Sequence, residues 1–216
     1  MKAVARKSLS EMRVSYGDHS LTSGQFRNGW FEMFQNWLTE AISGGVVEVN
    51  AMVLSVCADA PTTRTVLCKG IDESGLVFYT NGKSAKIDAI RKSPQVSVTF
   101  PWYAVQRQVH FRGVAKEVEP AESDAYWRAR PRGSQLAAWA SQQSDRARSR
   151  AVIDNAMMAV ARRFENCEDI PRPAQWGGWR IEPALVEFWQ GRENRLHDRL
   201  VLSRSESGWV VERLWP

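Results

Sequence analysis

The first clear pattern of apolar positions along the chain has the spacing of an α-helix. Five apolar residues fall on one face at this spacing: Trp30, Phe34, Trp37, Leu38 and Ile42. Two glycines, Gly44 and Gly45, follow directly, and glycine commonly ends a helix. The pattern predicts one amphipathic helix from Trp30 to Ile42, near the start of the fold.

Segments typical of β-strands dominate the chain after this helix. They are short runs rich in β-branched and aromatic residues, and turn-forming residues separate them. We expect strands at residues 51–57, 63–71, 76–80, 107–118, 178–187, 197–204 and 209–214, and another where Val96, Val98 and Phe100 alternate. The early segments follow one another closely, which predicts an antiparallel meander.

Helices are expected between these strands. Residues 84–92 and 120–130 have helical patterns, and Pro131 ends the second one. Residues 133–164 are rich in Arg and Ala and predict one or two more helices. Strands recur at both ends of the chain, which argues against a parallel, doubly wound sheet. The sequence therefore predicts a mainly β fold, an antiparallel barrel decorated by α-helices.

Length and composition indicate an ordered chain with one substantial core. With 216 residues, 44% of them hydrophobic, the chain fits a single domain. We expect residues 26–216 to form that domain and residues 1–25 to form a flexible N-terminal segment. The basic N-terminus lacks the apolar stretch of a secretory signal, and no apolar run is long enough to span a bilayer, so we expect a cytoplasmic location and no membrane partner.

Charge and cysteine content narrow the possible partners. The net charge is +5, but Lys and Arg are interspersed with Asp and Glu, which argues against a nucleic-acid partner and is equally consistent with a small anionic ligand. Cys57, Cys68 and Cys167 are far apart, so they predict neither a disulfide framework nor a metal site. No nucleophile elbow or glycine-rich phosphate loop is found either. These observations favour an enzyme that borrows its reactivity from an organic cofactor.

A row of cationic side chains near the C-terminus is the most informative local pattern. Residues 195–199 read Arg-Leu-His-Asp-Arg. In a strand, the period of two would place Arg195, His197 and Arg199 on one face, where they could bind an anionic or oxygen-rich ligand. A solvated edge face is the alternative interpretation of the same pattern.

Two further groups suggest anion binding. Arg64 and Lys69 lie at the two ends of one predicted strand, where strict alternation puts them on opposite faces. Either each serves a different group, or a bulge redirects one of them. Tyr126 and Arg130 share a helix face, with Ser134 just beyond, which resembles a phosphate clamp. A surface Tyr–Arg pair is the more common meaning of that spacing.

In chain order, and over nearly the whole length from Met12 to Pro216, these segments resemble the pyridoxine/pyridoxamine 5'-phosphate oxidase family. The matching runs are NAMV (50–53), RTVLCK (64–69), FYTN (78–81), FPW (100–102), RQV (107–109), RPRGSQ (130–135), AWASQQS (138–144), WGG (176–178), EFWQG (187–191), RLHDR (195–199) and RL (213–214). Such an ordered series is far more specific than any single motif.

The resemblance implies an FMN-binding split β-barrel that forms a homodimer, with FMN at the interface. It implies oxidation of pyridoxamine or pyridoxine 5'-phosphate to pyridoxal 5'-phosphate, with hydride transfer to flavin N5 and then reduction of O2 to H2O2. By the same likeness the FMN-binding residues would be Arg64, Thr65, Val66, Leu67, Cys68, Lys69, Tyr79, Thr80, Lys86, Gln108, Gln143, Ser144, Trp189 and Arg199.

The resemblance also assigns the substrate site. Lys69, Tyr126, Arg130 and Ser134 would hold the substrate phosphate, and the catalytic pair Arg195 and His197 would lie over the pyridine ring. Arg13 and Tyr16 match an N-terminal segment that closes over the substrate as a lid, although Val14 and Ser15 between them replace the usual charged pair.

Other departures from the family pattern leave alternatives open. Ala85 stands where the family usually has a basic residue beside Lys86, so one FMN phosphate contact is either lost or supplied by Lys83. One alternative function is a related FMN oxidase that acts on another aromatic metabolite, such as a phenazine precursor. Another is a module that binds FMN or pyridoxal phosphate without catalysis.

Overall fold

The computed structural model describes residues 8–12 and 14–216. Two compact units are distinguished by their internal contacts. The terminal unit comprises Met1–Val47, Pro101–Val109 and Val186–Pro216, and the central unit comprises Glu48–Phe100 and His110–Leu185. The expected flexible segment, residues 1–25, and the expected single domain, residues 26–216, remain predictions. No helix within the described residues is long and apolar enough to cross a membrane.

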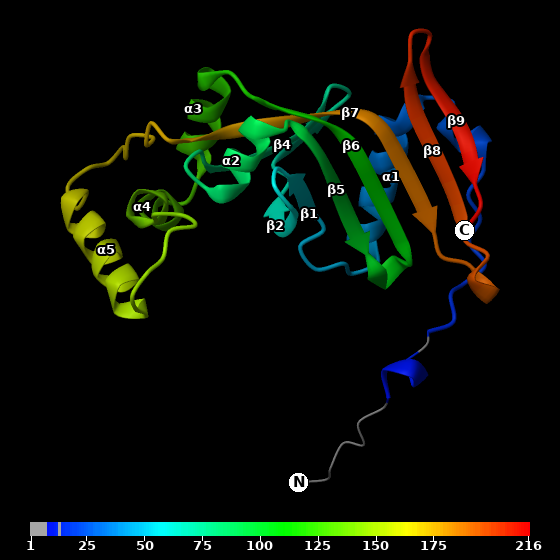
Figure 1. Ribbon diagram of the computed structural model, residues 1–216, viewed down its shortest axis with the longest axis horizontal. Coiled ribbons are helices and arrows are strands. Elements are labelled where there is room, and N and C mark those ends of the chain that lie inside the picture. The colour runs from blue at the N-terminus through cyan, green and yellow to red at the C-terminus, as the bar shows by residue number, and fades with distance from the viewer. Residues whose placement is uncertain (1–7, 13) are drawn as a thin grey trace. The chain divides into compact units, whose positions relative to one another are not determined.

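The central unit is built on a sheet, whose strands Figure 1 draws in colours from blue-cyan (β1) to orange (β7). The strands of the sheet are β1 (Ala51–Cys57), β2 (Pro61–Leu67), β3 (Gly70–Asp72), β4 (Gly75–Asn81), β5 (Gln95–Trp102), β6 (Arg107–Glu117) and β7 (Trp176–Gln190). The end of β5, the start of β6 and the end of β7 belong to the terminal unit. They lie in the order β2-β1-β5-β6-β7-β4-β3. The pairs β1–β2, β1–β5, β3–β4 and β4–β7 are antiparallel. Alternate residues of β1 and β5 are buried, as the alternating pattern predicts.

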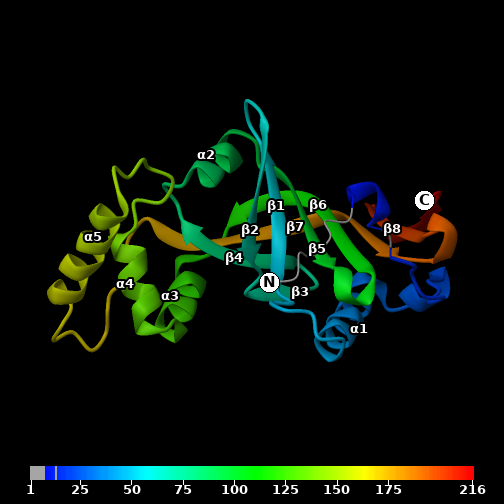
Figure 2. The same ribbon diagram turned by 90° about the horizontal axis from the view of Figure 1, so that it is seen from below.

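Four helices belong to the central unit: α2 (Ala85–Lys92), α3 (Pro120–Ala129), α4 (Arg132–Ala140) and α5 (Arg150–Arg163). Figures 1 and 2 both show α4 between α3 and α5. Pro131 separates α3 from α4, as expected from its effect on helices. A cluster of Trp127, Phe164, Ile170 and Trp176 forms the apolar core beneath these helices.

The terminal unit contains α1 (Gly29–Ser43), which confirms the predicted first helix, and the hairpin of β8 (Asp198–Ser205) and β9 (Gly208–Leu214). Its described residues also form the 3-10 turns η1 (Leu9–Glu11), η2 (Ser23–Phe26), η3 (Tyr103–Val105) and η4 (Glu193–Arg195). Trp37 of α1 packs against Phe188 of β7, with ring centroids 5.1 Å apart. The end of β7 also pairs with β8.

The structure corrects the expected strand over 63–71. That segment forms two strands, because β2 ends at Leu67 and β3 begins at Gly70. The backbone changes partner between them: Cys68 donates its N–H to Asn50 O over 2.9 Å, and Lys69 donates to Val77 O over 2.8 Å. Each of the two residues therefore follows a different neighbouring strand, and the alternation of faces does not continue to Lys69.

Candidate active site

A half-buried ammonium group is the centre of the first cluster, which lies in the central unit. Lys86, in the first turn of α2, donates hydrogen bonds from Nζ to Thr80 Oγ1 (2.8 Å), Ser84 Oγ (2.9 Å) and Gln143 Oε1 (2.7 Å). Burial lowers the pKa of Lys86 to about 8, and the positive charge of Arg64 adds to the effect. The cluster therefore unites predicted FMN residues from β2, β4, α2 and the segment after α4.

Arg64 and Lys86 are like charges that no carboxylate balances. Within the described part of the chain, neither side chain forms an ion pair. Arg64 donates to Thr62 Oγ1 over 2.9 Å, and burial lowers its pKa. Two close cations without a counter-charge favour a polyanionic ligand such as a phosphate ester.

The remaining predicted residues of the 64–69 segment differ in burial. Lys69 and Thr65 are exposed, Val66 and Leu67 are half-buried, and Cys68 is buried. Burial raises the pKa of the Cys68 thiol to about 11, so this residue is a neutral packing group. Lys69 lies past the end of β2, which ends at Leu67, and its exposed side chain is not part of the Lys86 cluster.

At Ala85, where the family usually has a basic residue, the start of α2 makes a backbone contact instead of presenting a cationic side chain. Ala85 donates its N–H to Ser144 Oγ over 3.2 Å. Ser144 has a φ angle of 79°, a conformation uncommon outside glycine. Lys83 is exposed and donates its backbone N–H to Asn81 Oδ1 over 2.8 Å. The predicted residues Gln143 and Ser144 therefore both reach α2.

The predicted phosphate clamp lies next to this cluster. Arg130 Nη2 donates to the carbonyl of Ser134 over 3.2 Å, and the guanidinium carbon lies 4.8 Å from the ring centroid of Trp176. Among the described residues, Arg130 Nε is the buried side-chain polar atom that has no hydrogen-bond partner. An unsatisfied buried N–H donor is costly, so this geometry favours a ligand that accepts from Arg130.

Aromatic rings form the wall of the clamp. Tyr126 stacks on Tyr79 with centroids 4.0 Å apart and an interplanar angle of 15°, and Tyr79 stacks on Trp176 at 5.5 Å. Burial and the nearby carboxylate of Glu122 raise the pKa of Tyr79 to about 12, so its phenol stays protonated at neutral pH. Trp176 belongs to the WGG run that matches the family, but no sequence pattern indicates its place beside Arg130.

One cavity connects the clamp to the Lys86 cluster. It has a volume of about 320 Å³, and its lining includes Tyr79, Thr80, Arg130, Ser134, Gln143 and Trp176. Residues expected to bind the cofactor and residues expected to bind the substrate phosphate thus face the same space.

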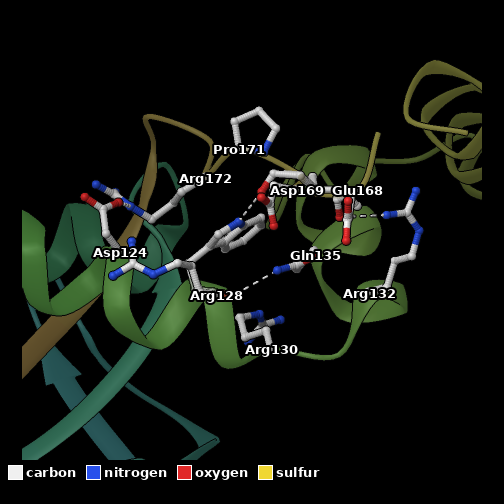
Figure 3. Close-up of a pocket in the computed structure, with 11 residues that line it drawn as sticks. Asp124, Arg128, Arg130, Arg132, Gln135, Glu168, Asp169, Pro171 and Arg172 are labelled. Atoms are coloured by element: carbon white, nitrogen blue, oxygen red, sulfur yellow. Dashed lines mark hydrogen bonds and ion pairs between the residues drawn. The ribbon is translucent and has the colours of Figure 1, made fainter. Parts of the chain in front are cut away.

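A second cavity of about 470 Å³ also borders Arg130, and Figure 3 shows the charged side chains around it. Protein groups already hold two of its arginines: Arg172 pairs with Asp124 at 2.6 Å, and Arg132 donates to the carbonyls of Phe164 and Cys167. Those two cations, unlike Arg130, are therefore satisfied within the protein.

The terminal unit contains the other cluster, in which three rings meet beside a guanidinium. The centroid of His197 lies 4.6 Å from that of Trp189 and 5.5 Å from that of Tyr16. The guanidinium carbon of Arg195 lies 5.6 Å from the Tyr16 centroid. Tyr16, Trp189, Arg195 and His197 are all predicted site residues, and Gln108 lines a cavity of about 370 Å³ together with Tyr16 and Trp189. Arg13 lies outside the described residues.

The expectation that Arg195, His197 and Arg199 share one strand face is wrong. Strand β8 begins only at Asp198, and Asn194 and Arg195 have φ angles of 55° and 65°, so the chain turns just before the strand. Arg195 and His197 meet at Tyr16 through this turn and not through strand alternation.

Arg199 has a different partner. In β8, its Nε and Nη2 donate to the two carboxylate oxygens of Glu187, at 2.7 and 3.1 Å. This bidentate pair raises the pKa of Arg199 further. Arg199 therefore remains a predicted FMN residue whose charge is balanced within the protein.

The protonation state of His197 follows from its surroundings. Arg192 donates its backbone N–H to His197 Nδ1 over 3.1 Å, so the neutral ring carries its proton on Nε2. Burial, and then the positive charge of Arg195, lower the pKa of His197. The ring is therefore a neutral hydrogen-bond donor at neutral pH. Sequence reasoning missed Arg192, because a backbone N–H leaves no trace in residue type.

Two family models match the chain. "Pyridoxamine 5'-phosphate oxidase" matches residues 38–164, and "Pyridoxine 5'-phosphate oxidase C-terminal dimerisation region" matches residues 176–216. A pyridoxine/pyridoxamine 5'-phosphate oxidase of Saccharopolyspora erythraea is 48% identical, over 96% of this chain and 95% of the relative. One of Mycobacterium leprae is 47% identical, over 96% of each chain.

A solved structure supports the same assignment. PhzG from Burkholderia lata 383, in complex with tetrahydrophenazine-1-carboxylic acid, aligns with a TM-score of 0.83 and 25% identity, over 93% of this chain and 100% of that one. The likeness confirms the predicted fold class, an antiparallel split barrel with helices. Together with the family models and relatives, it shows that this chain belongs to the pyridoxine/pyridoxamine 5'-phosphate oxidase family.

Proposed function

We propose that this enzyme uses FMN to oxidise pyridoxamine or pyridoxine 5'-phosphate to pyridoxal 5'-phosphate, with O2 reduced to H2O2. The observation that carries the proposal is the cavity that Arg130 lines together with Thr80 and Gln143 of the Lys86 cluster. A phosphorylated substrate would satisfy the first group, and a phosphorylated cofactor the second. Membership of the family supports both assignments.

The side chains present fit FMN. Arg64 and Lys86 would neutralise its phosphate, and Thr80, Gln143 and Ser144 would satisfy its hydroxyls and carbonyls. By the family likeness, Gln108, Trp189 and Arg199 are further proposed FMN contacts. When bound, FMN supplies the redox chemistry by accepting two electrons from the substrate and passing them to O2.

Protein groups orient the substrate. Arg130, with Ser134 and Tyr126, would hold the phosphate, and the Nε2–H of His197 would donate to the phenolic oxygen attached to the pyridine ring. Arg195 would place a positive charge over that ring, and Tyr16 would cover it and exclude water. In this arrangement the neutral imidazole of His197 acts as a hydrogen-bond donor. It does not need to accept a proton, so its pKa does not need to be raised.

The C-terminal family model, whose description names a dimerisation region, supports a homodimer. We place FMN at the interface of that dimer as part of the proposal. A cytoplasmic location completes the proposal. Size-exclusion chromatography with light scattering tests the dimer, and a monomeric holoenzyme would contradict it.

Anaerobic titration tests the reaction. The purified protein should be yellow, and pyridoxamine or pyridoxine 5'-phosphate should bleach it; after air is admitted, H2O2 should appear in proportion to the substrate. Flavin that stays oxidised would overturn the assignment. Binding without bleaching would instead indicate a non-catalytic module.

Oxidation of a phenazine precursor is a second candidate, and the match to PhzG favours it. The same titration separates the two functions when tetrahydrophenazine-1-carboxylic acid is used in parallel. Faster bleaching by that compound than by either vitamer would favour the second candidate.

A further inference from the structure

A buried carboxylate joins three segments of the terminal unit. Asp198 Oδ2 accepts hydrogen bonds from the backbone N–H of Leu21 (3.0 Å) and from Arg192 Nη1 (3.2 Å), and Oδ1 accepts from Arg213 Nη1. Arg213 Nη2 in turn donates to the carbonyl of Leu21 over 2.6 Å. The Asp198 side chain is only 10% exposed, so solvent does not replace these partners.

Two of the segments tied in this way carry Tyr16 and His197, whose rings lie 5.5 Å apart. We call residues 14–21 the N-terminal strap and residues 191–197 the histidine loop. Arg192, in the histidine loop, also pairs with Asp18 of the strap at 2.7 Å. Gln106 connects the same two segments, since its side chain accepts from Gly17 N and its carbonyl accepts from Gly191 N, both over 2.8 Å.

We propose that Asp198 is a positioning residue for substrate binding, which fixes the strap and the histidine loop against each other so that Tyr16 faces His197 and Arg195. Asp198 itself does not need to touch the substrate. Its carboxylate holds Leu21 on one side and Arg192 on the other, and Arg192 then holds His197 through its backbone N–H. The kinetic part of this inference rests on the proposed function.

The negative charge of the Asp198 carboxylate suits it to hold the strap and the histidine loop together. Two arginines and one backbone N–H point at Asp198, and their hydrogen bonds outweigh burial and lower its pKa. An amide of the same shape would turn an N–H₂ group toward a guanidinium or toward the Leu21 N–H. The variant Asp198→Asn therefore breaks the tie with a minimal change in volume.

Hydrogen exchange tests the tie without any substrate. In the FMN-loaded protein, Asp198→Asn should speed amide exchange in residues 14–21 by on the order of tenfold relative to the wild type. The control Glu182→Gln removes a carboxylate that pairs with Lys116 in the central unit at 2.7 Å, and it should leave the strap unchanged. Unchanged exchange in Asp198→Asn would overturn the proposal, whatever the enzyme's substrate.

A double-mutant cycle tests the consequence for binding. Asp198→Asn should raise KM for pyridoxamine 5'-phosphate by about tenfold, with FMN content retained and kcat changed less. In a Tyr16→Ala background, the same substitution should change KM by less than about twofold, because the strap no longer carries the ring that Asp198 positions. Equal effects in both backgrounds would reduce Asp198 to a stabilising role and contradict the proposal.

A milder variant covers the case in which Asp198→Asn folds poorly. Asp18→Asn removes only the exposed strap contact to Arg192, since the Asp18 side chain is 85% exposed. It should raise KM by about two- to threefold and lose this effect in the Tyr16→Ala background. An additive outcome would contradict the proposal.

If wild-type enzyme turns over neither vitamer, the proposed function fails, while faster exchange in Asp198→Asn would still support the tie.

Discussion

The guanidinium of Arg130 lies over the indole ring of Trp176, with Cζ 4.8 Å from the ring centroid, and its buried Nε has no hydrogen-bond partner. Stacking fixes the plane of the guanidinium and leaves a donor ready for an acceptor. We therefore expect Arg130→Lys to raise KM for the phosphorylated substrate by about tenfold, because an ammonium cannot reproduce the planar fork.

Arg128 provides the control for this prediction. It lies two residues earlier and is exposed, so Arg128→Lys should leave KM unchanged. Steady-state kinetics with pyridoxamine 5'-phosphate measures both variants. A similar KM for all three proteins would show that Arg130 does not hold the phosphate.

Lys86 should make FMN binding depend on pH. Its pKa of about 8 means that the apoprotein loses this positive charge as the pH rises from 7 to 9, and the phosphate of FMN loses a partner. The Kd for FMN, measured by fluorescence quenching of the apoprotein, should rise over this interval. Lys86→Met should weaken FMN binding by about tenfold or more and remove that pH dependence. The matched variant Lys83→Met, which removes an exposed lysine, should retain the pH dependence of FMN binding. Loss of that pH dependence in both variants would contradict the assignment of Lys86 to the FMN phosphate.

Arg195 should influence the protonation of His197. Burial and the charge of Arg195 lower the pKa of the imidazole, so removing that charge in Arg195→Ala should raise it. A proton would then bind His197 at higher pH than in the wild type and compete with the hydrogen bond from Arg192. NMR titration of the histidine ring protons measures the shift. An unchanged or lower pKa in Arg195→Ala would contradict the effect of the Arg195 charge on His197.

Arg199 should matter for both FMN and stability. Arg199→Ala leaves the Glu187 carboxylate, whose side chain is 14% exposed, without its bidentate partner. We expect a loss of about 1–3 kcal/mol in the free energy of unfolding, together with weaker FMN binding. In the Arg199→Ala/Glu187→Gln double variant, urea unfolding should show partial recovery of stability without recovery of FMN affinity. Recovery of both would place Arg199 outside the cofactor site.

Sequence periodicity predicted most of the regular elements, although it did not predict the break between β2 and β3. The apolar spacing around Trp37 predicted α1, and the alternation of Val96, Val98 and Phe100 predicted β5, because these patterns depend only on the geometry of a single segment. The ordered motifs were enough to indicate the family and its candidate site residues.

Tertiary structure decided which of those residues meet. Arg64, Lys86 and Gln143 are far apart in the chain, and only folding brings them together. The left-handed residues Asn194 and Arg195 redirect the chain before β8, so a strand argument could not place His197 against Tyr16. Local sequence sets the periodicity of a helix or strand. Contacts between residues far apart in the chain, such as that of Asp198 with Leu21, are not encoded in any local pattern and are seen only in the folded structure.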